Sequence, residues 1–285
     1  MNGLALCAGV GGLELGLQLA VPGYRCVGYC ERDTFAAATL VARMESEALD
    51  QAPIWDDLAT FPSELYRGTV DLITAGFPCQ PFSVAGQRKG TDDERWIWGD
   101  IARVIREVRP CFVFLENVPG LLANSGGYGT LLGDLAGLGF DAEWEVFSAS
   151  EVGAPQLRRR VFVLGYPNVE GSQGRSLRRK PKCKNKQPSG TASTEMGDTP
   201  SSGRERGISE PHKTRQRPFP PGPGEAEEWA ELIREDPSIE PSVCRVADGG
   251  SHRVDRLRCL GNGVVPVVAA LAFRALAARS GFIIN

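Results

Sequence analysis

The sequence predicts an α/β protein with a mostly parallel, doubly wound sheet that is interrupted by one small polar insert. Short apolar runs alternate with amphipathic stretches over the first ~165 residues, and a glycine-rich turn follows the first run. Beyond Pro167 the chain becomes rich in Ser, Gly, Pro, Lys and Arg and poor in apolar residues. The first pattern predicts the sheet, and the second predicts the insert.

The apolar runs give the expected strands, and the stretches between them give the expected helices. Strands are expected at Leu4–Leu6, Cys26–Tyr29, Val70–Ala75, Cys111–Leu115, Glu143–Phe147 and Val161–Tyr166. Helices are expected at Thr34–Met44, Asp100–Val108, Glu225–Arg234 and Val264–Ala278. The last helix is apolar enough to pack on the sheet. We therefore expect one domain built from residues 1–166 and 242–285, with the insert at 167–241.

Composition excludes several classes of protein. With 42% hydrophobic and 24% charged residues, the chain has the composition of a globular protein. No run approaches the ~20 apolar residues of a membrane span, and the N-terminus lacks the basic region of a signal peptide. Eight cysteines include no C-x-x-C pair, and there are only two histidines, so no metal site is expected.

Charge is distributed unevenly along the chain. The net charge is −3, yet residues 171–217 contain 12 Lys and Arg against 4 Asp and Glu. A basic block on an acidic body indicates either a local contact with a polyanion or a solvated loop.

The glycine-rich turn "AGVGG" predicts a ligand site. Gly9 and Gly11 allow a tight turn and a close ligand approach at the start of a helix. Glu31 lies 20 residues beyond Gly11, where a nucleotide-type fold places an acid that grips ribose hydroxyls. A packing turn without a ligand is the alternative. Asp57, after the apolar pair Ile54 and Trp55, is either a contact to an adenine amino group or a helix cap.

Two polar side chains follow the central strands of the predicted sheet. Cys79 comes after Pro78, which ends the strand, and Glu116 ends the next apolar run, "CFVFLEN". Both are expected at the carboxyl edge of the sheet, where open α/β folds bind ligands. Cys7, Cys26 and Cys111 are interpreted as ordinary buried cysteines. Residues 80–99 have the composition of a loop that closes over a site.

"QLRRRVFVLG" places three polar side chains two residues apart. In an extended chain Gln156, Arg158 and Arg160 project to one face, where a planar guanidinium suits a carbonyl oxygen or a phosphate. An edge strand that arginines keep soluble is the alternative.

Together these motifs resemble the DNA cytosine-5 methyltransferase family. The matches are "AGVGG" with Glu31, "GFPCQPFS", "DIARVIREVRP" followed by "FLENV", "QLRRRVFVLG" and "LGNGVVP", in the family's order. They cover residues 1–166 and about 255–280. The resemblance implies a Rossmann-like fold that depends on S-adenosylmethionine. It implies methyl transfer to carbon 5 of a flipped-out cytosine in duplex DNA, through a covalent Cys79 adduct.

The resemblance also implies the site residues. Catalysis is expected from Cys79, Glu116, Arg158 and Arg160. S-adenosylmethionine is expected to bind Leu6, Ala8, Gly9, Gly11, Gly12, Glu31, Asp57, Leu58, Pro78, Ile97, Asn262 and Val264. DNA is expected to contact Gln80, Ser83, Gln87, Arg88, Lys89 and Gln156, and, in the basic insert, Arg178, Arg179 and Lys180.

The chain departs from the family pattern before its last helix. "VCRVADGGSHRVDRLRC" stands where the family has a stretch with "R-L-Q-G-F", and the variant resembles compact prophage or restriction–modification members. The protein is expected to be a monomer that acts on double-stranded DNA in a prokaryotic cytoplasm. The alternatives are a tRNA cytosine-5 methyltransferase, which shares these motifs, and a non-catalytic homologue that binds nucleic acid.

Overall fold

The computed structural model describes residues 1–78, 96–122, 127–168, 219, 225–235 and 253–282. Its strands are β1 (Asn2–Leu6), β2 (Arg25–Cys30), β3 (Ile54–Trp55), β4 (Leu72–Gly76), β5 (Phe112–Asn117), β6 (Phe140–Ser148) and β7 (Arg159–Pro167). Its α-helices are α1 (Gly12–Ala20), α2 (Thr34–Glu45), α3 (Trp98–Val108), α4 (Gly127–Leu138), α5 (Ala226–Glu235), α6 (Arg253–Asn262) and α7 (Pro266–Arg279). Short 3-10 turns include η1 (Leu58–Thr60), η2 (Ser63–Tyr66) and η5 (Ala149–Val152).

The strands form one sheet of seven in the order β3-β2-β1-β4-β5-β7-β6. The first five strands are parallel to one another, whereas β7 runs antiparallel to both β5 and β6. The order reverses between β1 and β4, and this is the switch point at which open α/β sheets bind ligands. The predicted fold class, a mostly parallel Rossmann-like sheet, is confirmed.

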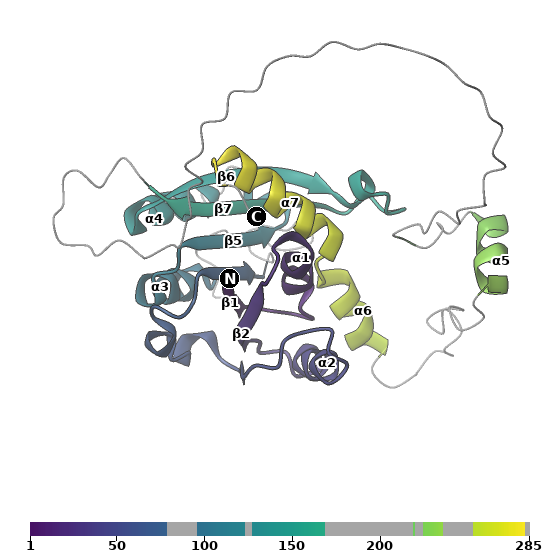
Figure 1. Cartoon of the computed structure of the whole chain (residues 1–285), viewed down its shortest axis with the longest axis horizontal. Helices are drawn as coiled ribbons and strands as arrows, with labels where there is room; N and C mark the ends of the chain where they lie inside the picture. The colour runs from purple at the N-terminus through teal and green to yellow at the C-terminus, as the bar shows by residue number, and fades with distance from the viewer. Residues whose placement is uncertain (79–95, 123–126, 169–218, 220–224, 236–252, 283–285) are drawn as a thin grey trace, which may run out of the picture.

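Helices cover both faces of the sheet (Figure 1). One core lies between the sheet and α1, α2 and α7, and the other lies between the sheet and α3, α4, η1 and η2. Successive residues of one strand alternate between the two cores: Ala5 belongs to the first, and Leu4 and Leu6 belong to the second. Burial on both faces explains why β1, β4 and β5 appear as continuous apolar runs.

The helix α7 is packed directly against α1. A Cβ atom on Gly16 would lie 2.6 Å from the Pro266 carbonyl oxygen and 2.6 Å from the Ala269 methyl group. Only glycine permits this approach, so α7 completes the same domain as the N-terminal strands.

The expectation that no run approaches a membrane span is wrong by length and composition, because the described residues include one such stretch, Val254–Arg279. It contains most of α6 and all of α7. The inward face of α7, including Val268, Phe273 and Leu276, is buried in the core beside the sheet. This part of the stretch is therefore a core helix of the domain.

The predicted strands and helices all appear, with ends shifted by a few residues. Two helices were not predicted. α4 contains three glycines after its first residue, which hide its helical pattern, and α6 is a separate helix before α7.

Candidate active site

The carboxyl edge of the central strands carries Glu116. The register of β4 and β5 sets Gly76 opposite Glu116, so both strands end at the same level. The Glu116 side chain is buried, and a Cβ atom on Gly76 would lie 3.5 Å from its Oε2 atom. The carboxyl group of Glu116 therefore lies beside the end of β4.

The partly exposed Arg160 and the buried Glu116 form an ion pair across neighbouring strands. The Nε atom of Arg160 lies 2.9 Å from Oε1 of Glu116. Burial raises the pKa of Glu116 to about 7, although the charges of Arg160 and Arg158 oppose that rise. A carboxyl group with such a pKa can be protonated or ionised near neutral pH, as a general acid requires.

The chain toward Cys79 is held by Asn117. Its Nδ2 atom donates a hydrogen bond to the Phe77 carbonyl oxygen at 3.3 Å, one residue before the exposed Pro78. Cys79 lies outside the described residues, as do Gln80, Ser83, Gln87, Arg88 and Lys89. Asn117 thus ties the end of β5, beside Glu116, to the segment that leads into Cys79.

The expectation that Gln156, Arg158 and Arg160 share one face of an extended chain is wrong. β7 begins only at Arg159, and Arg158 has a positive φ of 26°, which interrupts the alternation of side chains. The Leu157 carbonyl oxygen accepts a hydrogen bond from the backbone N–H of Ala149 at 3.0 Å, so this segment belongs to a turn against η5. Gln156 is exposed in that turn.

Arg158 binds protein carbonyl groups. Its Nη1 atom donates to the Gly261 carbonyl oxygen at 2.8 Å, and its Nη2 atom donates to that of Gly263. The guanidinium therefore joins the start of β7 to the loop between α6 and α7. Arg158 thus holds the "LGNG" segment while its charge also acts on Glu116, and its expected place beside the reacting base stays a prediction.

The glycine turn and Glu31 form one cradle. Gly11 takes the left-handed conformation that starts α1, and the backbone N–H of Gly9 donates to Oε2 of Glu31 at 2.7 Å. The N–H of Asp33 donates to the other carboxylate oxygen, also at 2.7 Å. Nothing lies within 4 Å of the position that a Cβ atom on Gly9 would occupy. The turn is thus open beside an oriented carboxylate, as the binding of a ribose requires.

The loop before α7 packs against the glycine turn. A Cβ atom on Gly12 would lie 2.5 Å from the Val264 carbonyl oxygen, so the two backbones are in direct contact. Asn262 is exposed at the end of α6, and Arg258 of the same helix forms an ion pair with Asp33. The structure therefore brings Val264 against the start of α1, and the expected cofactor contacts of Asn262 and Val264 stay predictions.

The remaining predicted cofactor residues lie at the ends of nearby elements. Asp57 caps η1 by accepting the Ala59 N–H at 3.0 Å, which confirms the helix-cap interpretation; a capping carboxylate can also contact a ligand, so the adenine contact stays a prediction. Ile97 is the N-terminal cap of α3. Leu6 is fully buried in the core and Leu58 nearly so, whereas Ala8 is partly exposed.

The other described cysteines differ from the expected nucleophile. Cys7, Cys26, Cys30 and Cys259 are free, and burial raises the pKa of each thiol, for Cys30 to about 12. They remain protonated near neutral pH and are poor nucleophiles. Among the described residues, no group of three or more His, Cys, Asp or Glu side chains is placed to hold a metal ion. Arg178, Arg179 and Lys180 lie outside these residues.

Three further candidates for functional residues are visible in the structure but were not predicted from the sequence. Asn117 and Arg103 act through hydrogen bonds to backbone carbonyl groups of distant segments. Glu14 is buried under the glycine turn, where Thr74 Oγ1 donates to its Oε1 atom at 2.6 Å. No sequence spacing signals such contacts, although a Glu on the apolar face of α1 is a visible anomaly.

Several curated proteins are similar to this chain. Type II methyltransferase M.PspPI of Psychrobacter sp. is 40% identical over 164 residues, which are 56% of this chain and 38% of that protein. M.NlaX of Neisseria lactamica is 36% identical over 57% of this chain and 51% of its own length. M.NaeI of Lentzea aerocolonigenes is also 36% identical, over 57% of this chain and 39% of its own length.

The aligned region thus spans between 38% and 51% of the length of these curated relatives. The family model described as C-5 cytosine-specific DNA methylase matches residues 1–219, which include the glycine turn, Glu116 and Arg160. The chain therefore belongs to the C-5 cytosine-specific DNA methylase family.

Proposed function

We propose that this protein transfers a methyl group from S-adenosylmethionine to carbon 5 of a cytosine in duplex DNA. The observation that carries the proposal is the ion pair of the buried Glu116 with Arg160 at the carboxyl edge of the sheet, with a carboxyl pKa of about 7. The relatives named above are all Type II methyltransferases, and the family is described as DNA methylases.

The open glycine turn fits the adenosine part of S-adenosylmethionine. Glu31 would accept hydrogen bonds from the ribose hydroxyls, and Gly9 and Gly11 would allow the ligand to approach the backbone. Asp57, Leu58 and Ile97 would line the adenine end. When bound, S-adenosylmethionine supplies an electrophilic methyl group on a sulfonium.

Cytosine carbon 5 is a weak nucleophile, and the protein side chains would activate it. The Cys79 thiolate adds to ring carbon 6, while protonated Glu116 donates its proton to ring nitrogen 3. The resulting enamine carbon 5 takes the methyl group. A base then removes the proton from carbon 5, the carbon–sulfur bond breaks, the Cys79 thiolate leaves, and nitrogen 3 returns its proton to Glu116. Arg160 holds the Glu116 carboxyl in place throughout.

The target base must leave the duplex, because its ring faces are stacked inside it. We assign closure over the flipped base to the loop of residues 80–99, and choice of the DNA sequence to the insert at 167–241. Removal of Gly171–Gly207 tests the second assignment. If the variant without Gly171–Gly207 keeps its affinity for DNA and its choice of DNA sequence, these residues are only a tether. We further propose that the protein acts as a monomer in a prokaryotic cytoplasm, like bacterial restriction–modification enzymes.

The test is methyl transfer from labelled S-adenosylmethionine to DNA and, in parallel, to tRNA. We expect label in DNA and a covalent complex with DNA that carries 5-fluorocytosine, because fluorine cannot leave as a proton. The Cys79→Ala variant should lose both while still binding S-adenosylhomocysteine. Label in tRNA alone would identify the RNA enzyme, and methylation by Cys79→Ala would refute the proposed chemistry.

A further inference from the structure

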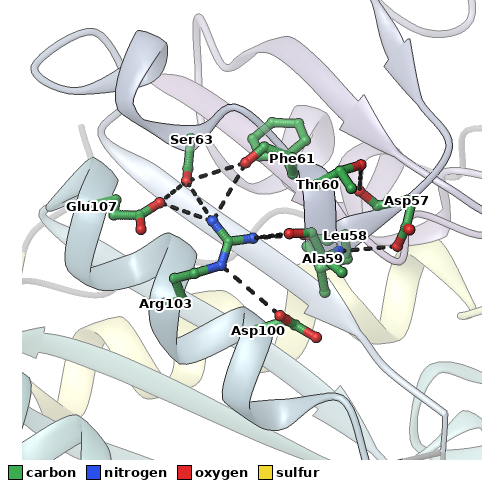
Figure 2. A network of polar contacts seen from close by, with 9 residues as sticks. All are labelled: Asp57, Leu58, Ala59, Thr60, Phe61, Ser63, Asp100, Arg103 and Glu107. Carbon is green, nitrogen blue, oxygen red and sulfur yellow. Dashed lines mark hydrogen bonds and ion pairs between the residues drawn. The ribbon is translucent and has the colours of Figure 1, made fainter.

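A single arginine of α3 holds the turn that leads to the expected adenine pocket (Figure 2). Arg103 projects from α3 toward η1, and its guanidinium faces the backbone carbonyl groups of that turn. Its Nη2 atom donates to the Leu58 carbonyl oxygen at 2.7 Å and to that of Ala59 at 3.3 Å. Its Nη1 atom donates to the Phe61 carbonyl oxygen at 3.4 Å. Three carbonyl groups of one short segment thus share one side chain.

The turn η1 is held by bonds from within the turn and from α3. It contains only three residues, and its Leu58 carbonyl oxygen accepts the Phe61 N–H at 3.2 Å. The Asp57 side chain accepts the Ala59 N–H at the N-terminal end, and Thr60 Oγ1 donates to the Asp57 carbonyl oxygen at 3.2 Å. Arg103 adds a second donor to the Leu58 carbonyl oxygen and a donor to that of Ala59. Asp57 and Arg103 therefore both fix the turn.

The guanidinium is itself oriented by its neighbours. Oε2 of Glu107, one helical turn further along α3, lies 2.9 Å from Nη1, and the Ser63 hydroxyl lies 3.2 Å from the same atom. The Nε atom lies 3.9 Å from an oxygen of Asp100. Exposed ion pairs usually contribute little to stability. Here, in contrast, a planar donor group is held against a fixed set of carbonyl oxygens, a geometry that lysine does not reproduce.

The same helix carries the opposite side of the expected pocket. α3 begins at its cap, Ile97, and Arg103 follows less than two turns later. Through Arg103, this one rigid helix is joined to the segment that contains Asp57 and Leu58. Arg103 thus joins the helix that begins after Ile97 to Asp57 and Leu58, the residues expected at the adenine end.

We propose that Arg103 is a positioning residue for S-adenosylmethionine, which acts by fixing Asp57 and Leu58 relative to Ile97. The proposal rests on the proposed function, because it assumes that this edge of the sheet binds the adenine of that cofactor. It predicts that loss of Arg103 weakens cofactor binding and leaves DNA binding unchanged. At saturating cofactor it predicts a nearly unchanged kcat, because Glu116 and Cys79 are untouched.

The experiment uses Arg103→Met, which keeps the aliphatic stem and removes the donors, in the full chain. Titration calorimetry with S-adenosylhomocysteine should show a dissociation constant raised by about 10- to 100-fold, the equivalent of one or two charge-assisted hydrogen bonds. The KM for S-adenosylmethionine should rise by a similar factor. Arg103→Lys should recover part of the affinity, and Arg106→Ala, an exposed arginine of the same helix, should change nothing.

General loss of stability is controlled by Leu135→Ala, which truncates a buried side chain of α4 and should lower the melting temperature at least as much. A normal dissociation constant in that variant, beside a raised one in Arg103→Met, supports the proposal. Wild-type affinity in Arg103→Met, or the same loss in Leu135→Ala, overturns it. If the wild-type protein itself fails to bind S-adenosylhomocysteine, the proposed function fails, and this inference fails with it.

Discussion

Glu14 is expected to make the stability of the domain depend on pH. Its carboxyl group is buried beneath the glycine turn, where Oε1 accepts the Thr74 hydroxyl at 2.6 Å and Oε2 has no hydrogen-bond partner. Burial raises the pKa of Glu14 from 4.5 to about 7, against a smaller opposing effect of the Thr74 hydrogen bond. The folded protein therefore holds the Glu14 proton more tightly than the unfolded chain does.

The sign and the size of the effect follow from this difference. Below pH 4.5 the group is protonated in both states, and its contribution to stability is fully present. As the pH rises through the folded pKa of about 7, that contribution is lost. At 1.36 kcal/mol for each pKa unit, the complete loss is about 3 kcal/mol, of which roughly 2 kcal/mol falls between pH 5 and pH 8.

The measurement is urea unfolding at pH 5, 6, 7 and 8 for wild type, Glu14→Gln and Glu45→Gln. Glutamine cannot ionise, so in Glu14→Gln the free energy of unfolding should fall by about 2 kcal/mol less than in wild type across this range. Glu45 is exposed on α2, and its variant should follow wild type. Equal slopes in wild type and Glu14→Gln would refute the argument, whatever the absolute stability of the variant.

Three further predictions concern the site and the insert. Glu116→Gln should slow methyl transfer by roughly 10²–10⁴-fold with little change in cofactor affinity; in wild type, the rate should fall as the pH rises above about 7, because ionised Glu116 cannot donate a proton. A loss confined to cofactor binding would contradict this role. Arg158→Met should lower the melting temperature and the methylation rate together, because it leaves the carbonyl groups of the loop before α7 without their donor; wild-type values in calorimetry and turnover would exclude that bridge. Replacing Arg178, Arg179 and Lys180 by glutamine should weaken DNA binding evenly across sequences and reduce the salt slope of log K by roughly 3. An unchanged slope in a filter-binding titration would remove these residues from the DNA contact.

The sequence predicted the sheet well because its strands are buried on both faces. Continuous apolar runs such as "DLITAGF" leave few alternatives to a central parallel strand, and the polar group after each run marks the carboxyl edge. The same reasoning predicted that Glu31 lies at the glycine turn and that Glu116 lies at the end of β5, and the structure has both at these positions. These positions depend on the local order of residues, which a sequence displays directly.

Contacts between distant segments could not be predicted in this way. The segment from Gln156 to Arg158 looks extended, but its conformation is decided by a positive φ and by carbonyl contacts with η5 and α6. Arg103 looks like any surface arginine of an amphipathic helix. Its role becomes visible only when η1, more than forty residues earlier, is placed beside it. Side chains that bind backbone carbonyl groups leave no periodic pattern.

The late position of α7 has a consequence for synthesis of the protein. About 100 residues separate the end of β7 from the start of α7, yet α7 covers the sheet beside α1. At about 5 to 20 residues per second, the ribosome needs roughly 5 to 20 s to make that stretch. During this interval the apolar face formed by Phe114 and Phe162 has no helix to cover it. The nascent chain is then most exposed to aggregation, and chaperones that bind apolar surfaces should meet it at this stage.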